Sequence, residues 1–127
     1  MPPSKADTVR AIWGAYQRDG LDALLAHADP DSTWIPACAR GRILRGHADL
    51  LEFFRSLQAK GMKLHARADA IEEVRDTVLV RGSLRVERRG ALRESTMVWA
   101  YRLHDGRVQE SRAFRSRREA LAAIGAG

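Results

Sequence analysis

Three side chains that could do acid/base chemistry recur at every second position of one segment. They are His65, Arg67 and Asp69. Alternate residues of a β-strand share a face, so this spacing would present a base, a cation and a carboxylate together. If that face lines a pocket, we expect His65 and Asp69 to carry protons and Arg67 to stabilise negative charge on a substrate. The alternative is a solvated face, which a one-residue slip or a bulge would produce, with the even-numbered residues from 62 to 70 pointing to the core.

The segment from Leu92 to Phe114 predicts a β-hairpin and therefore which side chains share a face. Asp105-Gly106 between two β-rich runs is typical of a two-residue turn whose residues both have positive φ. With a regular register, Ala100 faces Ser111 across the hairpin. One face then carries Val98, Ala100, Arg102, Gln109, Ser111 and Ala113. The opposite face carries Trp99, Tyr101, Leu103, Val108, Glu110, Arg112 and Phe114.

The first of these faces could contact a ligand if it lines a pocket. Ser111 is its best polar candidate, whereas Arg102 and Gln109 are more typical of a solvated cross-strand pair. Other elements would add aromatic surface, although core packing alone also explains Tyr16 and Trp34. The residues predicted to bind a ligand are Tyr16, Trp34, Phe54, Arg67, Val80, Thr96, Val98, Ser111 and Ala113.

The second face of the hairpin is too apolar to be left in water. Trp99, Tyr101 and Phe114 would form a contiguous apolar patch there. Such a patch marks an interface between proteins. We therefore expect a homodimer that packs sheet against sheet through this face.

Composition excludes several classes of function. The 127 residues suit one domain, and no apolar run approaches the ~20 residues of a membrane span. The single cysteine, Cys38, rules out an internal disulfide and a cysteine-rich zinc site. The net charge of +6 comes mostly from arginines spread along the chain, which makes nucleic-acid binding an unfavoured interpretation. We expect a cytoplasmic protein with no metal and no cofactor.

The order of predicted elements is typical of an α+β fold. We expect one domain over residues 1–127, with residues 1–5 as a flexible tail. The apolar spacing and the turn residues predict helices that end at Gly20 and at Asp29-Pro30-Asp31, then a short strand over 32–35 and a third helix over about 47–60. The expected meander strands span 62–74, 77–86, 92–103 and 108–114. Ser116 and Glu119 form a capping box for a closing helix.

Four short strings, taken in order, resemble the nuclear-transport-factor-2-like superfamily, and in particular its SnoaL-like branch. They are Gly20-Leu21-Asp22-Ala23-Leu24, Trp34-Ile35-Pro36, Leu44-Arg45-Gly46 and His104-Asp105-Gly106-Arg107-Val108. The resemblance implies a cone, with helices packed on the concave face of a strongly curved mixed or antiparallel sheet. It also implies a cofactor-free protein, commonly a homodimer, that binds a small apolar organic molecule. The family includes isomerases, cyclases and dehydratases as well as binding modules without known chemistry.

The chain departs from the catalytic patterns of that superfamily. Ala113 stands where cyclase-like members carry Asp, and Gly82 and Leu84 stand where epoxide hydrolases need Arg and Asp. Ile35 and Ile12 replace the base and the phenol of the steroid isomerases. None of these residues can carry a proton. We therefore hold open two functions, namely a ligand-binding protein with acid/base activity through His65 and Asp69, and a non-catalytic binding or dimerisation module.

Overall fold

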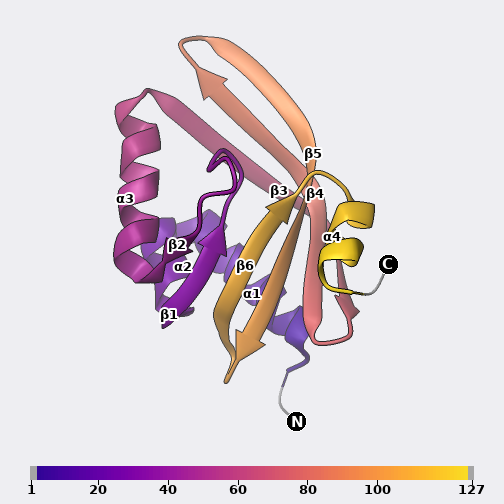
Figure 1. Ribbon diagram of the computed structural model, residues 1–127. Helices are drawn as coiled ribbons and strands as arrows, with labels where there is room; N and C mark the ends of the chain where they lie inside the picture. Colours follow the sequence, from indigo (N-terminus) through magenta and orange to yellow (C-terminus); the bar gives the residue numbers. More distant parts are fainter. Residues whose placement is uncertain (1–2, 126–127) are drawn as a thin grey trace.

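The sheet is built around long antiparallel strands joined by tight turns. The computed structural model describes residues 3–125, and its six strands run in the order β2-β1-β6-β5-β4-β3. The β1–β6 pair is parallel and the other pairs are antiparallel. Their bounds are β1 Ala28–Ile35, β2 Leu44–Arg45, β3 Met62–Val74, β4 Thr77–Arg88, β5 Ala91–His104 and β6 Arg107–Phe114. The sheet is strongly curved and does not close (Figure 1), which confirms the predicted α+β class.

Helices cover both faces of the sheet, but unequally. The concave face holds the larger core, to which α1 and α3 contribute buried residues, with α2 packed against it. A short helix at the C-terminal end covers part of the convex face, where Ala120 packs on Leu79, Val98, Ala100 and Phe114 (Figure 1). The helices are α1 Lys5–Asp19, α2 Leu21–Ala26, α3 Gly46–Ala59 and α4 Arg117–Ala123.

The turn that anchors the last hairpin is confirmed. Asp105 and Gly106 have φ values of 50° and 76°. Such a turn matches the right-handed twist of the flanking strands, which is why it favours Asp-Gly. Leu103 pairs with Val108, as the two-residue turn requires.

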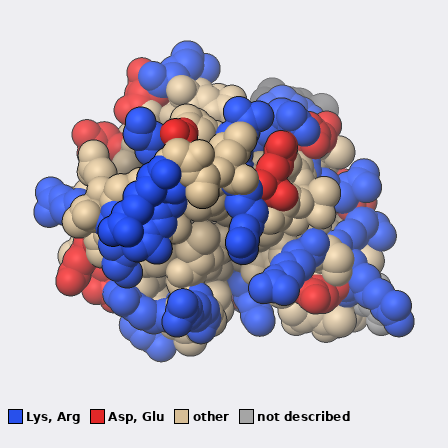
Figure 2. All heavy atoms as spheres, turned by 90° about the horizontal axis from the view of Figure 1, so that it is seen from above, with Lys and Arg blue, Asp and Glu red and all other residues tan. Residues whose placement is uncertain are grey.

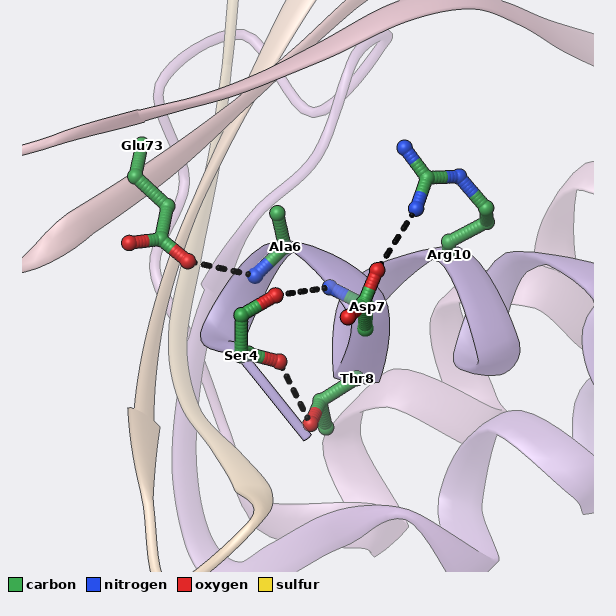
Figure 3. A network of polar contacts seen from close by, with 6 residues as sticks. All are labelled: Ser4, Ala6, Asp7, Thr8, Arg10 and Glu73. Atoms are coloured by element: carbon green, nitrogen blue, oxygen red, sulfur yellow. Dashed lines mark hydrogen bonds and ion pairs between the residues drawn. The ribbon is translucent and has the colours of Figure 1, made fainter. Parts of the chain in front are cut away.

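The start of the chain differs from the predicted tail. Ser4 caps α1, since its Oγ accepts a hydrogen bond from the Asp7 amide at 3.1 Å, and Lys5 is already helical. The Ala6 amide donates to Glu73 Oε1 of β3 at 2.9 Å, which joins the helix to the sheet (Figure 3). Residues 1–2 of the predicted tail lie outside the described residues.

The first strand is longer than predicted. Asp29-Pro30-Asp31 was expected to end a helix, but α2 ends at Ala26 and β1 begins at Ala28. Pro30 has no amide hydrogen, and it is tolerated here because the ladder to β6 is interrupted between Ala28 and Thr33. The Asp31 amide finds a local acceptor in Asp29 Oδ1, at 3.1 Å.

Two β-bulges decide which side chains face the helices. In β3, Ala68 pairs with Gly82 and Ala70 with Arg81, so Asp69 is an extra residue. In β6, the ladder jumps from the Leu103–Val108 pair to the Arg102–Glu110 pair, so Gln109 is extra. A bulge inserts one residue into one strand, and every side chain beyond it changes face relative to a regular register.

The C-terminal helix is fixed to β3 by an ion pair. Arg117 Nε donates to Glu72 Oε1 at 2.6 Å, and this bond holds the pKa of Glu72 below its usual value. A carboxyl whose pKa is lower in the folded state adds stability above its unfolded pKa, and this stability is lost as the pH falls. We therefore expect Glu72→Gln to lower Tm slightly at pH 7, and the difference from wild type to vanish as the pH drops below the ordinary Glu value of 4.5. A difference that does not change with pH, followed by thermal melts from pH 7 to pH 3, would contradict this assignment.

Candidate ligand cavity

An apolar cavity lies between the concave face of the sheet and the helices. Its volume is about 100 Å³. It forms where helices with one apolar stripe meet a curved sheet, since α1 supplies Ile12, Trp13 and Tyr16 and α3 supplies Leu50, Phe53 and Phe54. From the sheet come Trp34, Leu64, Ala66, Leu84, Trp99, Tyr101 and Ser111.

All three tryptophans of the chain lie in the cavity wall. Trp13 and Trp99 pack edge to face, with ring centroids 4.9 Å apart and an interplanar angle of 65°. Phe53 and Phe54 make a similar pair at 5.6 Å. Edge-to-face contact is a favoured arrangement of aromatic rings. The wall is therefore largely aromatic on the sides formed by α1, α3 and β5.

Few polar groups reach this wall. Trp34 Nε1 donates to the buried Ser32 Oγ at 2.8 Å, so its hydrogen bond is satisfied inside the protein. Trp13 Nε1 is buried and, among residues 3–125, has no hydrogen-bond partner. It lies beside the Tyr101 hydroxyl and lowers the pKa of that group as a hydrogen-bond donor does, although the contact falls short of the geometry of a formed hydrogen bond. Trp13 Nε1 is thus a buried donor of a wall residue that lacks a fully formed hydrogen bond within residues 3–125.

The two tyrosines of the wall stay protonated at neutral pH. Burial raises the pKa of Tyr101, and the neighbouring Trp13 and Ser111 side chains offset only part of the rise. Burial also raises the pKa of Tyr16. Both hydroxyls can therefore donate a hydrogen bond but cannot serve as a base. Within the described part of the chain, no Asp, Glu or His lies in the cavity wall.

The prediction that His65, Arg67 and Asp69 face the cavity is wrong. All three are exposed, and Arg67 Nε donates to Asp69 Oδ1 at 2.9 Å in a solvated ion pair. The bulge at Asp69 is the physical reason, because it turns Leu64 and Ala66 toward the cavity instead. The solvated alternative is the one that the structure bears out, so His65 and Asp69 lose the geometry on which a catalytic role depended.

Four of the other predicted residues do surround the cavity. They are Tyr16, Trp34, Phe54 and Ser111. Val80 is fully buried beside the cavity, in the core of the concave face, but is not in its wall. Their role in binding a ligand stays a prediction.

Three predicted pocket residues lie elsewhere. Val98 packs in the core of the convex face, and Thr96 is exposed. Ala113 and Thr96 line an open groove that we call the mouth, formed by the loop after β1, the tip of the β4–β5 hairpin and the end of β6. The bulge at Gln109 separates Val98 from Ser111 and Ala113, because it places Ser111 opposite Tyr101, Ala113 opposite Trp99 and Val98 opposite Phe114.

The predicted dimer face does not exist as one surface. Trp99 and Tyr101 point into the cavity, whereas Phe114 lies on the convex face beneath α4. The same bulge at Gln109 separates them. A homodimer stays a prediction, but these residues cannot form its interface together. Sequence reasoning missed Trp13, Trp99 and Tyr101 as cavity residues.

Two further observations concern membrane spans and metal-binding clusters. No helix within residues 3–125 is both long enough and apolar enough to cross a membrane. In the same residues, no three side chains of the metal-binding types gather into a cluster.

Comparison with known proteins supports a specific fold. The family model described as SnoaL-like domain matches residues 9–111. Among solved structures, the chain is similar to an NTF2-like protein of unknown function from Burkholderia pseudomallei, with 24% identity, a TM-score of 0.76 and coverage of 96% of this chain and 98% of that one. A search of curated proteins found no match.

Two other structures share the fold at lower identity. One is a protein of ketosteroid isomerase-like fold from Catenulispora acidiphila in complex with trimethylamine, with 17% identity, a TM-score of 0.72 and coverage of 98% and 96%. The other is an LEH-like epoxide hydrolase from M. tuberculosis, with 15% identity, a TM-score of 0.70 and coverage of 95% and 96%. At these identities the similarity concerns the fold.

Proposed function

We propose that this chain, which belongs to the SnoaL-like domain family, binds a small apolar organic molecule with one oxygen acceptor in its cavity. The apolar cavity with its aromatic wall carries the proposal, and the indole N–H of Trp13 in that wall lacks a fully formed hydrogen bond. A buried donor left without a partner costs about 1–3 kcal/mol. A ligand oxygen at this position would remove that cost, and the aromatic wall would enclose the rest of the molecule.

The size of the cavity limits the ligand. Its volume of about 100 Å³ is smaller than a cavity known to take up benzene, which measures about 150 Å³. A single ring or a short branched chain is therefore the largest apolar group that enters with only small side-chain adjustments. Larger molecules must leave part of their length outside the cavity.

Binding without acid/base catalysis is the function that the wall supports. Tyr101 can donate a hydrogen bond to a carbonyl oxygen, but among the described wall residues none can accept a proton at neutral pH. Isomerisation, cyclisation and dehydration by acid/base chemistry each need such a group. The proton carriers expected from the sequence lie on the solvated face, so the non-catalytic alternative becomes the leading one.

The test uses two ligands of nearly the same shape, cyclohexanone and methylenecyclohexane. Tryptophan fluorescence reports occupancy, because all three tryptophans line the cavity. We expect both to bind the wild type. In Trp13→Phe the affinity for the ketone should fall about fivefold more than that for the hydrocarbon, as the loss of one hydrogen bond implies. An absence of any fluorescence change with both probes, or an equal loss for both in the variant, would contradict the proposal.

A second expectation follows from the solvated face of β3. His65→Ala and Asp69→Asn should leave the affinity for cyclohexanone within about twofold of wild type, since exposed surface changes rarely exceed about 0.5 kcal/mol. The same fluorescence titration measures this. A loss of more than about tenfold in either variant would restore these residues to the binding site.

A further inference from the structure

The cavity opens toward a strongly basic mouth. The mouth shares wall residues with the cavity, namely Pro36, Ala37 and Leu84. Its volume is about 1490 Å³, far larger than that of the cavity. A molecule that occupies the cavity and exceeds its length would therefore extend into the mouth.

Arginines from several elements line this mouth. Arg40 comes from the loop after β1, Arg88 and Arg93 from the tip of the β4–β5 hairpin, and Arg112 and Arg115 from the end of β6. Figure 2 looks down on this end of the molecule and shows many blue side chains, with fewer red ones among them, on the tan surface. These positively charged side chains thus lie around one opening, although they are scattered along the sequence.

The register explains why two of these arginines face the mouth. Every second residue of β4 faces the concave side, and these residues include Leu84, Val86 and Arg88. Arg93 of β5 pairs with Val86 and therefore faces the same side. Arg88 and Arg93 therefore share the face that carries Leu84 into the cavity wall. Arg85, which pairs with Glu94, lies on the other face of the same strand.

Most of these charges are not neutralised within the protein. Among residues 3–125, no carboxylate forms an ion pair with Arg40, Arg88, Arg93 or Arg115. Within the described part of the chain, Glu119 is the one acidic residue that lines the mouth. It already accepts a hydrogen bond from the Arg115 amide at 3.3 Å. A concave site lined by one sign of charge concentrates ions of the opposite sign.

We infer that the ligand is an amphipathic organic anion, with an apolar ring in the cavity and a carboxylate among the arginines of the mouth. This inference rests on the proposed function and names the class of ligand. The apolar cavity provides no counter-charge, so the anionic group must remain outside it. Arginine matches this group, because its planar guanidinium can hold a carboxylate by two hydrogen bonds.

The test compares 3-phenylpropanoate with its neutral analogue 3-phenylpropanamide by tryptophan fluorescence. We expect the carboxylate to bind at least about fivefold more tightly at an ionic strength of about 20 mM, and most of this preference to disappear at about 500 mM, where exposed charges are screened. The double variant Arg88→Gln/Arg93→Gln should weaken this preference, because two of the five arginines of the mouth are removed, and should leave the affinity for the amide unchanged.

A matched control separates local contacts from the overall charge. Arg81→Gln/Arg85→Gln removes the same number of exposed charges from the same hairpin, in this case from β4 alone and outside the mouth. This variant should keep the preference for the carboxylate. Suppose that the amide binds. An equal loss of the carboxylate preference in both double variants, or no such preference in the wild type, would then overturn the inference. If neither molecule binds, the proposed function itself fails.

Discussion

Replacement of Gly82 by alanine should destabilise the protein by about 3 kcal/mol or more, since the strand it faces must move. A Cβ built on Gly82 would lie 1.7 Å from the carbonyl oxygen of Arg67 and 2.8 Å from the carbonyl carbon of the same residue. Both are backbone atoms, so no side-chain rotation relieves the clash. Gly82 stands opposite the bulge at Asp69, where β3 approaches β4 closely. Chemical denaturation would measure the change in the free energy of unfolding.

Gly14→Ala is the matched control. Its Cβ would lie 3.3 Å from Arg18 Nη1, which is the flexible end of an exposed side chain. Alanine is favoured over glycine inside a helix by up to about 1 kcal/mol, so this variant should be neutral or slightly more stable. If Gly82→Ala unfolds at the same denaturant concentration as Gly14→Ala, then β3 and β4 do not approach each other as the structure shows.

Replacement of Ala66 by phenylalanine should abolish ligand binding. Ala66 lies in β3 with its side chain in the cavity wall, and a phenyl ring there would occupy the space proposed for the ligand. We expect the affinity for cyclohexanone to fall by at least about 100-fold, which corresponds to about 2.8 kcal/mol. The protein should remain folded, because the ring fills space that already exists and overpacking costs only about 1–3 kcal/mol. Fluorescence titration gives the affinity and a thermal melt confirms the fold.

Arg67→Phe provides the comparison on the same strand. It introduces the same side chain one residue away, on the exposed face. Its affinity for cyclohexanone should match that of the wild type. Retention of binding in Ala66→Phe, or an equal loss in both variants, would show that the ligand does not occupy this cavity.

Most of the fold can be predicted from turns and apolar spacing. Asp105-Gly106 fixes the last hairpin because few other residue pairs accept positive φ at both positions. The spacing of Val9, Ile12 and Trp13 identifies the buried face of α1. These signals are local, and the residues that carry them determine the local backbone directly.

The faces of the strands could not be predicted in the same way. A bulge changes every assignment beyond it, and Gln109 carries no feature that distinguishes it from a regular strand residue. The regular register therefore assigned Trp99 and Tyr101 to an outer face, although both line the cavity. For the other bulge a signal did exist, because a glycine inside a strand, here Gly82, indicates a bulge or a close approach of backbones.

Candidate residues on the helices and at the end of β1 were predicted more accurately. Tyr16, Trp34 and Phe54 lie around the cavity as expected, because helix periodicity and a strand end do not depend on long registers. Ser111 also lies there, but only because the bulge at Gln109 turns it to the face that carries Tyr101. The composition of the cavity wall is therefore a property of the folded sheet rather than of any one motif.

A crystal structure of the protein soaked with bromobenzene would test the central claim most directly, since bromine can be located by its anomalous scattering. We predict a single ordered ring between Trp13, Trp99 and Ser111. Bromine density only on the outer surface, or a cavity closed by its own side chains, would contradict it.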